Sequence, residues 1–120
     1  MESEAAILSF AALAQATRLE VFRLLVKHEP DGLPAGDLAR ELVVPQNTMS
    51  AHLAILSRAG LVTSKRHSRS IVYRANLPAL QTLTLFMIQD CCGGRPDLCV
   101  PLFESLEPRC PPRAKRKTNV

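Results

Sequence analysis

The stretch 33–62 constrains the fold of this chain more than any other, because it predicts two helices joined by a tight turn. Pro34 suits the first position of a helix, where the missing N–H of proline costs nothing. Leu38 and Leu42 then recur at the spacing of one helix face. Val43-Val44-Pro45 ends this segment, because the residue before a proline is biased away from helical conformation.

The second helix of the pair is predicted over Gln46 to Ala59. Its apolar positions, Met49, Leu53 and Leu56, share one helix face and are expected to be buried. Gly60 is the expected stop, since glycine readily adopts the left-handed conformation found at helix ends. The spacing therefore predicts a helix-turn-helix, although other helical hairpins imitate that motif.

The opposite face of the second helix carries mostly small and polar side chains. At about 100° per residue, the following lie away from the apolar stripe: Asn47, Ser50, Ala51, Ala54 and Arg58. Short side chains let a helix approach the major groove of DNA closely, and amides and hydroxyls can hydrogen-bond to base edges. An ordinary solvated face has the same composition, so the pattern alone leaves both interpretations open. We predict base contacts by Asn47, Ser50, Ala51 and Ala54.

After Gly60 the pattern changes from helical to extended. Residues 61–64 and 70–74 are two β-prone runs, and the basic segment between them contains Lys65, Arg66 and Arg69. Two strands joined by a basic loop, directly after such a helix, form a wing that places cations on the phosphate backbone. A hairpin that only closes the core is the alternative. We predict that Lys65, Arg66 and Arg69 contact phosphates.

The first and last helices are unusually apolar. Residues 4–14 are rich in alanine and leucine, and the helix that Pro78 opens places Leu80, Leu83 and Met87 on one face. Neither helix can face water on every side. We predict that they pair across a two-fold axis in a homodimer, which would present two recognition helices about 34 Å apart to successive major grooves.

These segments predict one domain over residues 1–92, mainly α with a small β-hairpin, as a winged helix-turn-helix. It includes a helix over 15–27 with Leu19, Phe22 and Val26 on one face, and a turn at 29–32. From Gly93 the composition shifts towards proline and arginine. We predict that residues 93–120 form a cysteine-containing tail whose end is disordered.

Charge and composition narrow the class of partner. The net charge of +4 on 120 residues is concentrated in residues 62–75 and from 109 onward, which suits a polyanionic partner such as double-stranded DNA. No apolar run reaches the roughly 20 residues of a membrane span, and the N-terminus lacks the basic start of a signal peptide. We therefore expect a cytoplasmic protein with no membrane partner, whose four cysteines are mostly reduced.

Two segments carry a family resemblance. Residues 13–25 (LAQATRLEVFRLL) and 47–62 (NTMSAHLAILSRAGLV), followed by a hairpin that contains Tyr73, resemble the ArsR/SmtB family of small metal-responsive repressors. The resemblance covers about Ser9 to Arg74. It implies a winged helix-turn-helix homodimer that represses a resistance or efflux operon and loses affinity for operator DNA when an inducer binds.

Two better-known inducer sites of that family are missing. Residues 33–38 lack the two cysteines of the arsenic site that usually reads LCVCDL, and the last helix lacks the histidines of the zinc site. Residues 90–99 (DCCGGRPDLC) instead resemble a subtype of arsenic-responsive repressors with three thiols at that end of the chain.

The chemistry of these thiols agrees with that resemblance. Trivalent arsenic and antimony are thiophilic, and three thiolates arranged as a pyramid satisfy their coordination. Soft thiolate ligands bind such centres in preference to hard cations. Cys91 and Cys92 supply two sulfurs, and Gly93-Gly94 lets the chain fold back to present Cys99. We predict that Cys91, Cys92 and Cys99 bind As(III), or Sb(III), as the inducer, and that Arg95 favours the thiolate form.

Other roles for these cysteines stay open. Cys110 would complete a four-thiolate site for zinc or cadmium, and Cys99 with Cys110 could pair in a thiol-redox sensor. Buried structural cysteines are a third alternative. A thiol-dependent oxidoreductase or metal reductase is disfavoured, because no Cys-x-x-Cys follows a strand and no βαβ pattern is present. A winged-helix module that binds only proteins is disfavoured by the basic wing, so we expect no enzyme but a DNA-binding regulator.

Two further residues, His52 and Arg18, lie outside the predicted DNA-contact and inducer sets. His52 lies at the edge of the apolar stripe, and we interpret it as a packing residue. Arg18 near the start of the second helix fits either a phosphate contact or an ordinary surface position, and the sequence does not decide between them.

Overall fold

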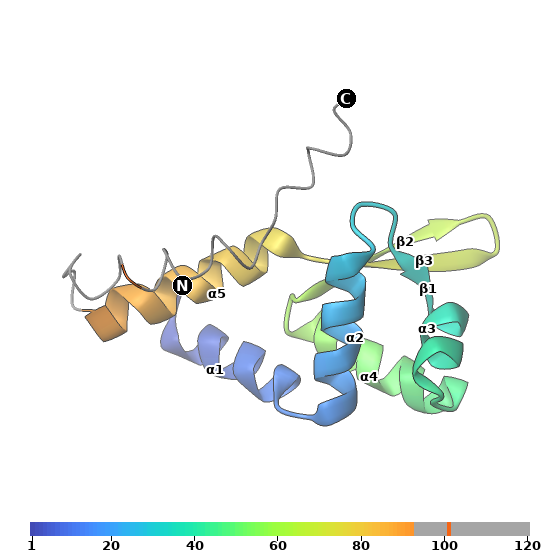
Figure 1. Cartoon of the computed structure of the whole chain (residues 1–120), viewed down its shortest axis with the longest axis horizontal. Helices are drawn as coiled ribbons and strands as arrows, with labels where there is room; N and C mark the ends of the chain where they lie inside the picture. Colours follow the sequence, from blue (N-terminus) through green and yellow to red (C-terminus); the bar gives the residue numbers. More distant parts are fainter. Residues whose placement is uncertain (93–100, 102–120) are drawn as a thin grey trace. The chain divides into compact units, whose positions relative to one another are not determined.

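A computed structural model describes residues 1–92 and residue 101. The elements run in the order α1 (Ser3–Leu13), α2 (Ala16–Lys27), β1 (Leu33–Pro34), α3 (Ala35–Leu42), α4 (Gln46–Arg58), β2 (Val62–His67), β3 (Ser70–Ala75) and α5 (Leu77–Cys92) (Figure 1). Met1–Phe86 forms one compact unit, and a second begins at Met87 within α5. The first unit is a mainly helical winged helix-turn-helix, as predicted.

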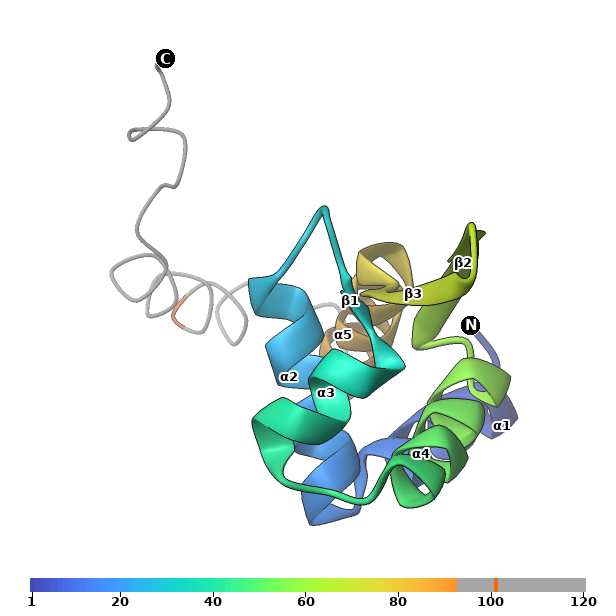
Figure 2. The ribbon, with the colours of Figure 1, turned by 90° about the vertical axis from the view of Figure 1, so that its right-hand side faces the viewer.

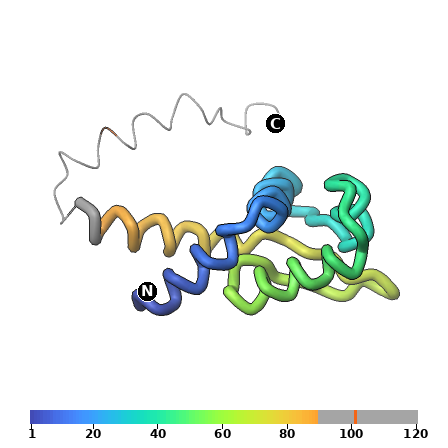
Figure 3. Tube along the Cα trace, turned by 90° about the horizontal axis from the view of Figure 1, so that it is seen from below, coloured from blue at the N-terminus to red at the C-terminus, as the bar shows by residue number. Residues whose placement is uncertain are grey.

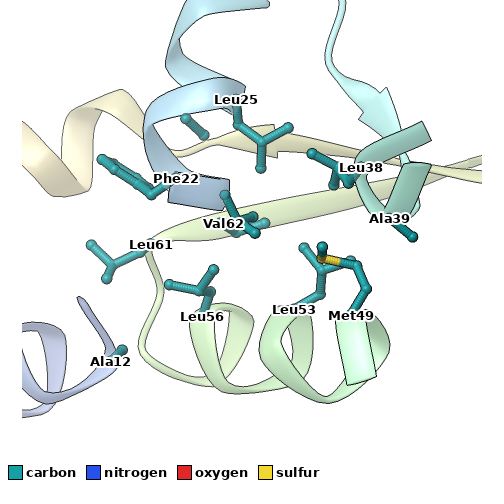
Figure 4. Packing of buried hydrophobic residues seen from close by; sticks show 12 residues of the cluster. Ala12, Phe22, Leu25, Leu38, Ala39, Met49, Leu53, Leu56, Leu61 and Val62 are labelled. Atoms are coloured by element: carbon teal, nitrogen blue, oxygen red, sulfur yellow. The ribbon is translucent and has the colours of Figure 1, made fainter. Parts of the chain in front are cut away.

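Helices α2, α3 and α4 share one apolar core with the hairpin (Figure 4). The large side chains that are fully excluded from solvent are Val21, Leu25, Leu38, Met49, Leu53, Leu56 and Leu61. Burying each such side chain contributes about 1.5–3 kcal/mol. The predicted stripe on α4 is therefore confirmed, and it fixes which side of α4 faces inward.

The helix-turn-helix has a strained turn. Val43 follows α3 in the left-handed conformation, with a φ of 54°, and its side chain is 88% exposed. The chain then passes through Val44-Pro45 into α4, which lies beside α3 (Figure 2). At the other end of α4, Gly60 has a φ of 80°, which confirms its predicted role as the stop.

The hairpin is longer than predicted. Strands β2 and β3 pair antiparallel from Val62 opposite Ala75 to His67 opposite Ser70, and the hairpin extends beyond the helices (Figures 1 and 3). The prediction of a basic loop over 65–69 is wrong, because Lys65, Arg66 and His67 belong to β2 and only Ser68 and Arg69 make the turn. Continued pairing satisfies backbone groups that a five-residue loop would leave to solvent.

A third strand was not predicted. Leu33 and Pro34 form β1, which pairs with Tyr73 and Val72 of β3 at one edge of a sheet ordered β1-β3-β2. Pro34 therefore precedes α3 instead of opening it, with the extended ψ of 157° that an edge strand accepts from proline. Gly32 allows the approach, since a Cβ there would lie 2.4 Å from the backbone oxygen of Tyr73.

The predicted face of α2 needs correction. In α2 the buried side chains are Val21, Phe22 and Leu25, whereas Leu19 is 44% exposed. The α2 stripe is thus rotated from the predicted one, because α2 packs on α3, α4 and β3 together. In α5, Leu83 is buried, whereas Met87 of the same predicted face is exposed, as an apolar surface predicted to meet a second copy of the chain would be.

Candidate nucleic-acid interface

All seven residues predicted to contact DNA lie on the surface. The four on α4 are exposed while Met49, Leu53 and Leu56 of the same helix are fully buried: Asn47, Ser50, Ala51 and Ala54. The three in the wing are exposed as well: Lys65, Arg66 and Arg69. The core thus orients α4 so that its small, polar side is available to a partner.

A depression of about 290 Å³ joins α4 to the wing. Its lining combines the start of α3, the start of α4 and the turn end of the hairpin: Pro34, Ala35, Gly36, Gln46, Ser50, Arg69, Ser70, Ile71 and Tyr73. We call it the inner depression. It brings together Ser50, predicted to face bases, and Arg69, predicted to contact phosphate, although they are distant in the sequence.

The inner depression suits an anion. Ala35 is the first residue of α3 and Gln46 the first of α4, so both helices begin at its wall. The first amide groups of a helix have no partner within the helix and carry the positive end of its dipole. With the guanidinium of Arg69 added, the depression offers the donors and charge that a backbone phosphate requires.

The two faces of the wing are not equivalent. Side chains alternate along a strand, so Lys65 and Arg66 project from opposite faces of the hairpin. Lys65 lies with His67 on a second depression of about 440 Å³, which the loop residues Pro30 and Asp31 complete. We call this the outer depression. Lys65 is therefore separated from the inner depression that Ser50 and Arg69 share.

The fourth basic residue of the wing region is engaged within the fold. Arg74 donates from Nη2 to Oε1 of Glu29 at 2.7 Å and from Nε to Oε2 at 3.4 Å. The hydrogen bond and charge of Glu29 raise the pKa of Arg74 above its ordinary value. Arg74 thus joins the hairpin to the end of α2, and the cations left to meet a phosphate backbone are Lys65, Arg66 and Arg69.

Arg18 and His52 occupy an internal contact. Arg18 Nε donates to the carbonyl oxygen of Ala12 at 2.6 Å, and Arg18 Nη1 lies 3.4 Å from Nδ1 of His52. Both side chains are half-buried. The interpretation of His52 as a packing residue agrees with this position, and the Arg18 guanidinium is engaged by groups within the fold.

The cysteine predictions fall largely at the edge of the described chain. Cys91 and Cys92 are the last two residues of α5. Cys99 and Cys110 lie outside the described residues, as does the tail predicted over 93–120. Among the side chains that are described, no three of His, Cys, Asp or Glu converge as a metal site would require.

Sequence reasoning missed two parts of the inner depression. Gly36 and Gln46 line it because each stands at the start of a helix. Gln46 had a detectable signal, since it follows Pro45 at the first position of the predicted recognition helix. Gly36 had none, because its place beside the wing depends on the pairing of β1 with β3.

Known proteins resemble this chain in sequence. Residues 13–65 match a family of proteins described as helix-turn-helix domain. The transcriptional activator HlyU of Vibrio cholerae is 32% identical over 71 residues, which are 59% of this chain and 63% of HlyU, slightly less than two thirds. The transcriptional repressor SdpR of Bacillus subtilis is 29% identical over 89 residues, 74% of this chain and 96% of SdpR.

A solved structure extends the likeness. The ArsR-like transcriptional regulator from Rhodococcus sp. RHA1 superposes with a TM-score of 0.64 at 28% identity, covering 86% of this chain and 92% of that one. These relatives are transcriptional regulators and not enzymes, which confirms the prediction of no enzyme.

No single helix among residues 1–92 is long and apolar enough to cross a membrane; the bent pair of α1 and α2 meets that test by length and composition only.

Proposed function

We propose that this chain is a homodimeric transcriptional repressor of the ArsR/SmtB type that binds operator DNA and is released by trivalent arsenic. The observation that carries the DNA-binding part is the inner depression, which Arg69 of the wing and Ser50 of α4 both line. In this arrangement α4 enters the major groove, with Asn47, Ser50, Ala51 and Ala54 towards the bases. The wing follows the phosphate backbone alongside.

The exposed apolar surface of α1 supports dimerisation. Ile7, Leu8 and Phe10 are 65%, 50% and 40% exposed, although α1 has buried positions at Ala6, Ser9 and Ala12. In α5, Leu77 and Leu85 are exposed as well. Large apolar side chains on one surface mark a protein–protein contact. We assign this contact to a second copy of the chain, joined through α1 and α5, which would present two α4 helices to successive major grooves.

Arsenic sensing is assigned to the thiols at the end of α5. Cys91 and Cys92 are adjacent at the helix end, and Cys99 would supply the third sulfur. Arsenous acid, As(OH)₃, would exchange with three thiols: three As–S bonds form, three As–O bonds break, and three water molecules leave. Antimonous acid would react in the same way. A regulator bound to operator DNA works in the cytoplasm, where such thiols stay reduced.

The release of DNA requires that the inducer favour one dimer geometry over another. An inducer shifts the equilibrium only by its preference for the DNA-incompetent state, typically about 1–3 kcal/mol of coupling. Closing three sulfurs around one atom at the end of α5 would reorganise the helix that we assign to the dimer contact. The same contact sets the distance between the two α4 helices.

The test is a titration of arsenite into the complex of the purified protein with its own promoter DNA under reducing conditions, followed by fluorescence anisotropy. Release at near-stoichiometric arsenite, unchanged in Cys110→Ser and abolished in Cys91→Ser and Cys92→Ser, is the expected result. All four proteins should bind the DNA equally without arsenite. A protein that never binds the promoter would contradict the repressor assignment.

The second candidate uses the same cysteines for zinc or cadmium, or as a thiol-redox sensor. Cys110 is the observation that favours it, since it supplies a fourth thiol for a tetrahedral site. Release by zinc or cadmium alone, lost in Cys110→Ser, would establish the four-thiolate site. Release by an oxidant such as diamide, reversed by dithiothreitol, would establish the redox sensor. A separate experiment tests whether the protein represses or activates its promoter. If it represses, a reporter gene driven by the promoter should become active when the gene for this protein is deleted.

A further inference from the structure

Arg18 lies where three helices meet. It belongs to the first turn of α2, its Nε donates to the carbonyl oxygen of Ala12 in α1 at 2.6 Å, and its Nη1 lies 3.4 Å from Nδ1 of His52 in α4. The backbone N–H of Arg18 donates to Oε1 of Gln15, which caps α2. One side chain thus contacts both neighbouring helices while its own helix end is held in place.

The bond to Ala12 stabilises the end of α1. The last carbonyl groups of a helix have no partner within it and carry the negative end of its dipole, so a guanidinium there is favourable. Ala12 is 3% exposed, so water has little access to this carbonyl oxygen. Neither of the two ion pairs among the described residues includes Arg18. Its side-chain contacts go instead to Ala12 of α1 and His52 of α4.

The bond to His52 constrains α4. An arginine donates and never accepts, so in a hydrogen bond at this contact Nδ1 of His52 is the acceptor. At about 100° per residue, His52 lies on the flank of α4 opposite to Ser50 and Ala54. A contact on one flank of a helix sets the rotation of the other flank about the helix axis. The core fixes which side of α4 faces outward, and the contact with Arg18 adds a second constraint on the rotation of that side.

We propose that Arg18 is a positioning residue that couples α1 to the DNA-binding side of α4. This inference rests on the proposed function, in which α1 forms the dimer contact and α4 reads the operator. A change in the placement of α1 would move the carbonyl oxygen of Ala12, then the guanidinium, and then His52. Lysine could not replace it, because a single ammonium lacks the planar fork that reaches two separated acceptors at fixed angles.

The test is a double-mutant cycle on operator affinity with Arg18→Met and His52→Leu. Each single variant should weaken binding about tenfold, and the double variant should be no weaker than either single one, since both changes break the same link. His52→Asn should stay within about twofold of the wild type, because its Oδ1 takes the place of Nδ1 as acceptor. His52→Leu leaves the bond to Ala12 intact, so it tests the link even if Arg18→Met disturbs α1.

Arg23→Met is the matched control, since it removes the same charge from an exposed position on the same helix. It should bind the operator as the wild type does. Affinities are compared well below the unfolding temperature of each variant. Additive losses, or equal weakening by His52→Leu and His52→Asn, would overturn the coupling role. Loss of stability with unchanged affinity would show that the contact is only structural. A wild-type protein that fails to bind its promoter would contradict the proposed function itself.

Discussion

The inward and outward sides of α4 differ in what fixes each residue. Inward, Met49, Leu53 and Leu56 are fully buried, so their size and shape are set by the surrounding core. Outward, Ser50 and Ala54 are exposed and contribute little to stability. We therefore expect one helix to serve two separable purposes, folding of the core and binding of DNA. Changes on the inward side should alter folding, and changes on the outward side should alter affinity for DNA.

The largest expected effect is on the inward side. Leu53→Ala should lower the free energy of unfolding by about 2–5 kcal/mol, because it removes buried methyl groups and leaves a cavity. Urea denaturation followed by circular dichroism measures this change. Leu19→Ala is the control, because Leu19 is 44% exposed; it should cost less than about 1 kcal/mol. Equal losses in the two variants would contradict the description of the core.

A charge on the outward side should separate affinity from stability. Ala54→Glu places a carboxylate against the DNA surface, and like-charge contacts of this kind cost several kcal/mol, so operator affinity should fall about 100-fold. The free energy of unfolding should change by less than about 0.5 kcal/mol. Anisotropy and urea denaturation on the same samples measure both. Ala16→Glu, which adds the same charge to an exposed position at the start of α2, outside the assigned DNA and dimer contacts, should leave affinity unchanged.

The wing offers a smaller and more discriminating effect. Arg69→Ala should lower operator affinity and reduce the slope of log affinity against log salt by about 0.9, the value for one lost phosphate contact. Lys65→Ala should reduce the slope less, because Lys65 lines the outer depression with Asp31 while Arg69 lines the inner one beside α4. Both variants lose one charge, so net charge is matched. Identical slopes would show that the two faces of the wing contact DNA equally.

The smallest effect is expected at Val43, an apolar residue that is exposed to solvent. A left-handed conformation costs a non-glycine residue about 1–2 kcal/mol, and glycine removes this cost. Glycine also gives the unfolded chain more conformational freedom, which offsets about 0.5–1 kcal/mol of that gain. Val43→Gly should therefore raise the free energy of unfolding by about 0.5 kcal/mol, the net of these terms. Thermal unfolding measures it. Val44→Gly should instead destabilise, because Val44 packs against the core.

Much of the fold could be predicted because its signals are local. Helical spacing identified the buried stripe of α4, Gly60 marked its end, and the β-prone runs after it indicated the hairpin. The exposed side of α4 follows from the same periodicity. Each of these features depends on residues within one or two turns of each other, so a linear pattern contains them.

Other features were decided by the tertiary structure, because their partners are distant in the chain. Arg18 and His52 are 34 positions apart, and Arg74 and Glu29 are 45 apart. The pairing of Leu33 with Tyr73 made β1 from residues predicted to open a helix. Helical periodicity alone predicted which side of α4 is exposed and which side chains lie on it. Only packing decided which cations stand beside that helix, since strand pairing and the inner depression bring together residues that no local pattern connects.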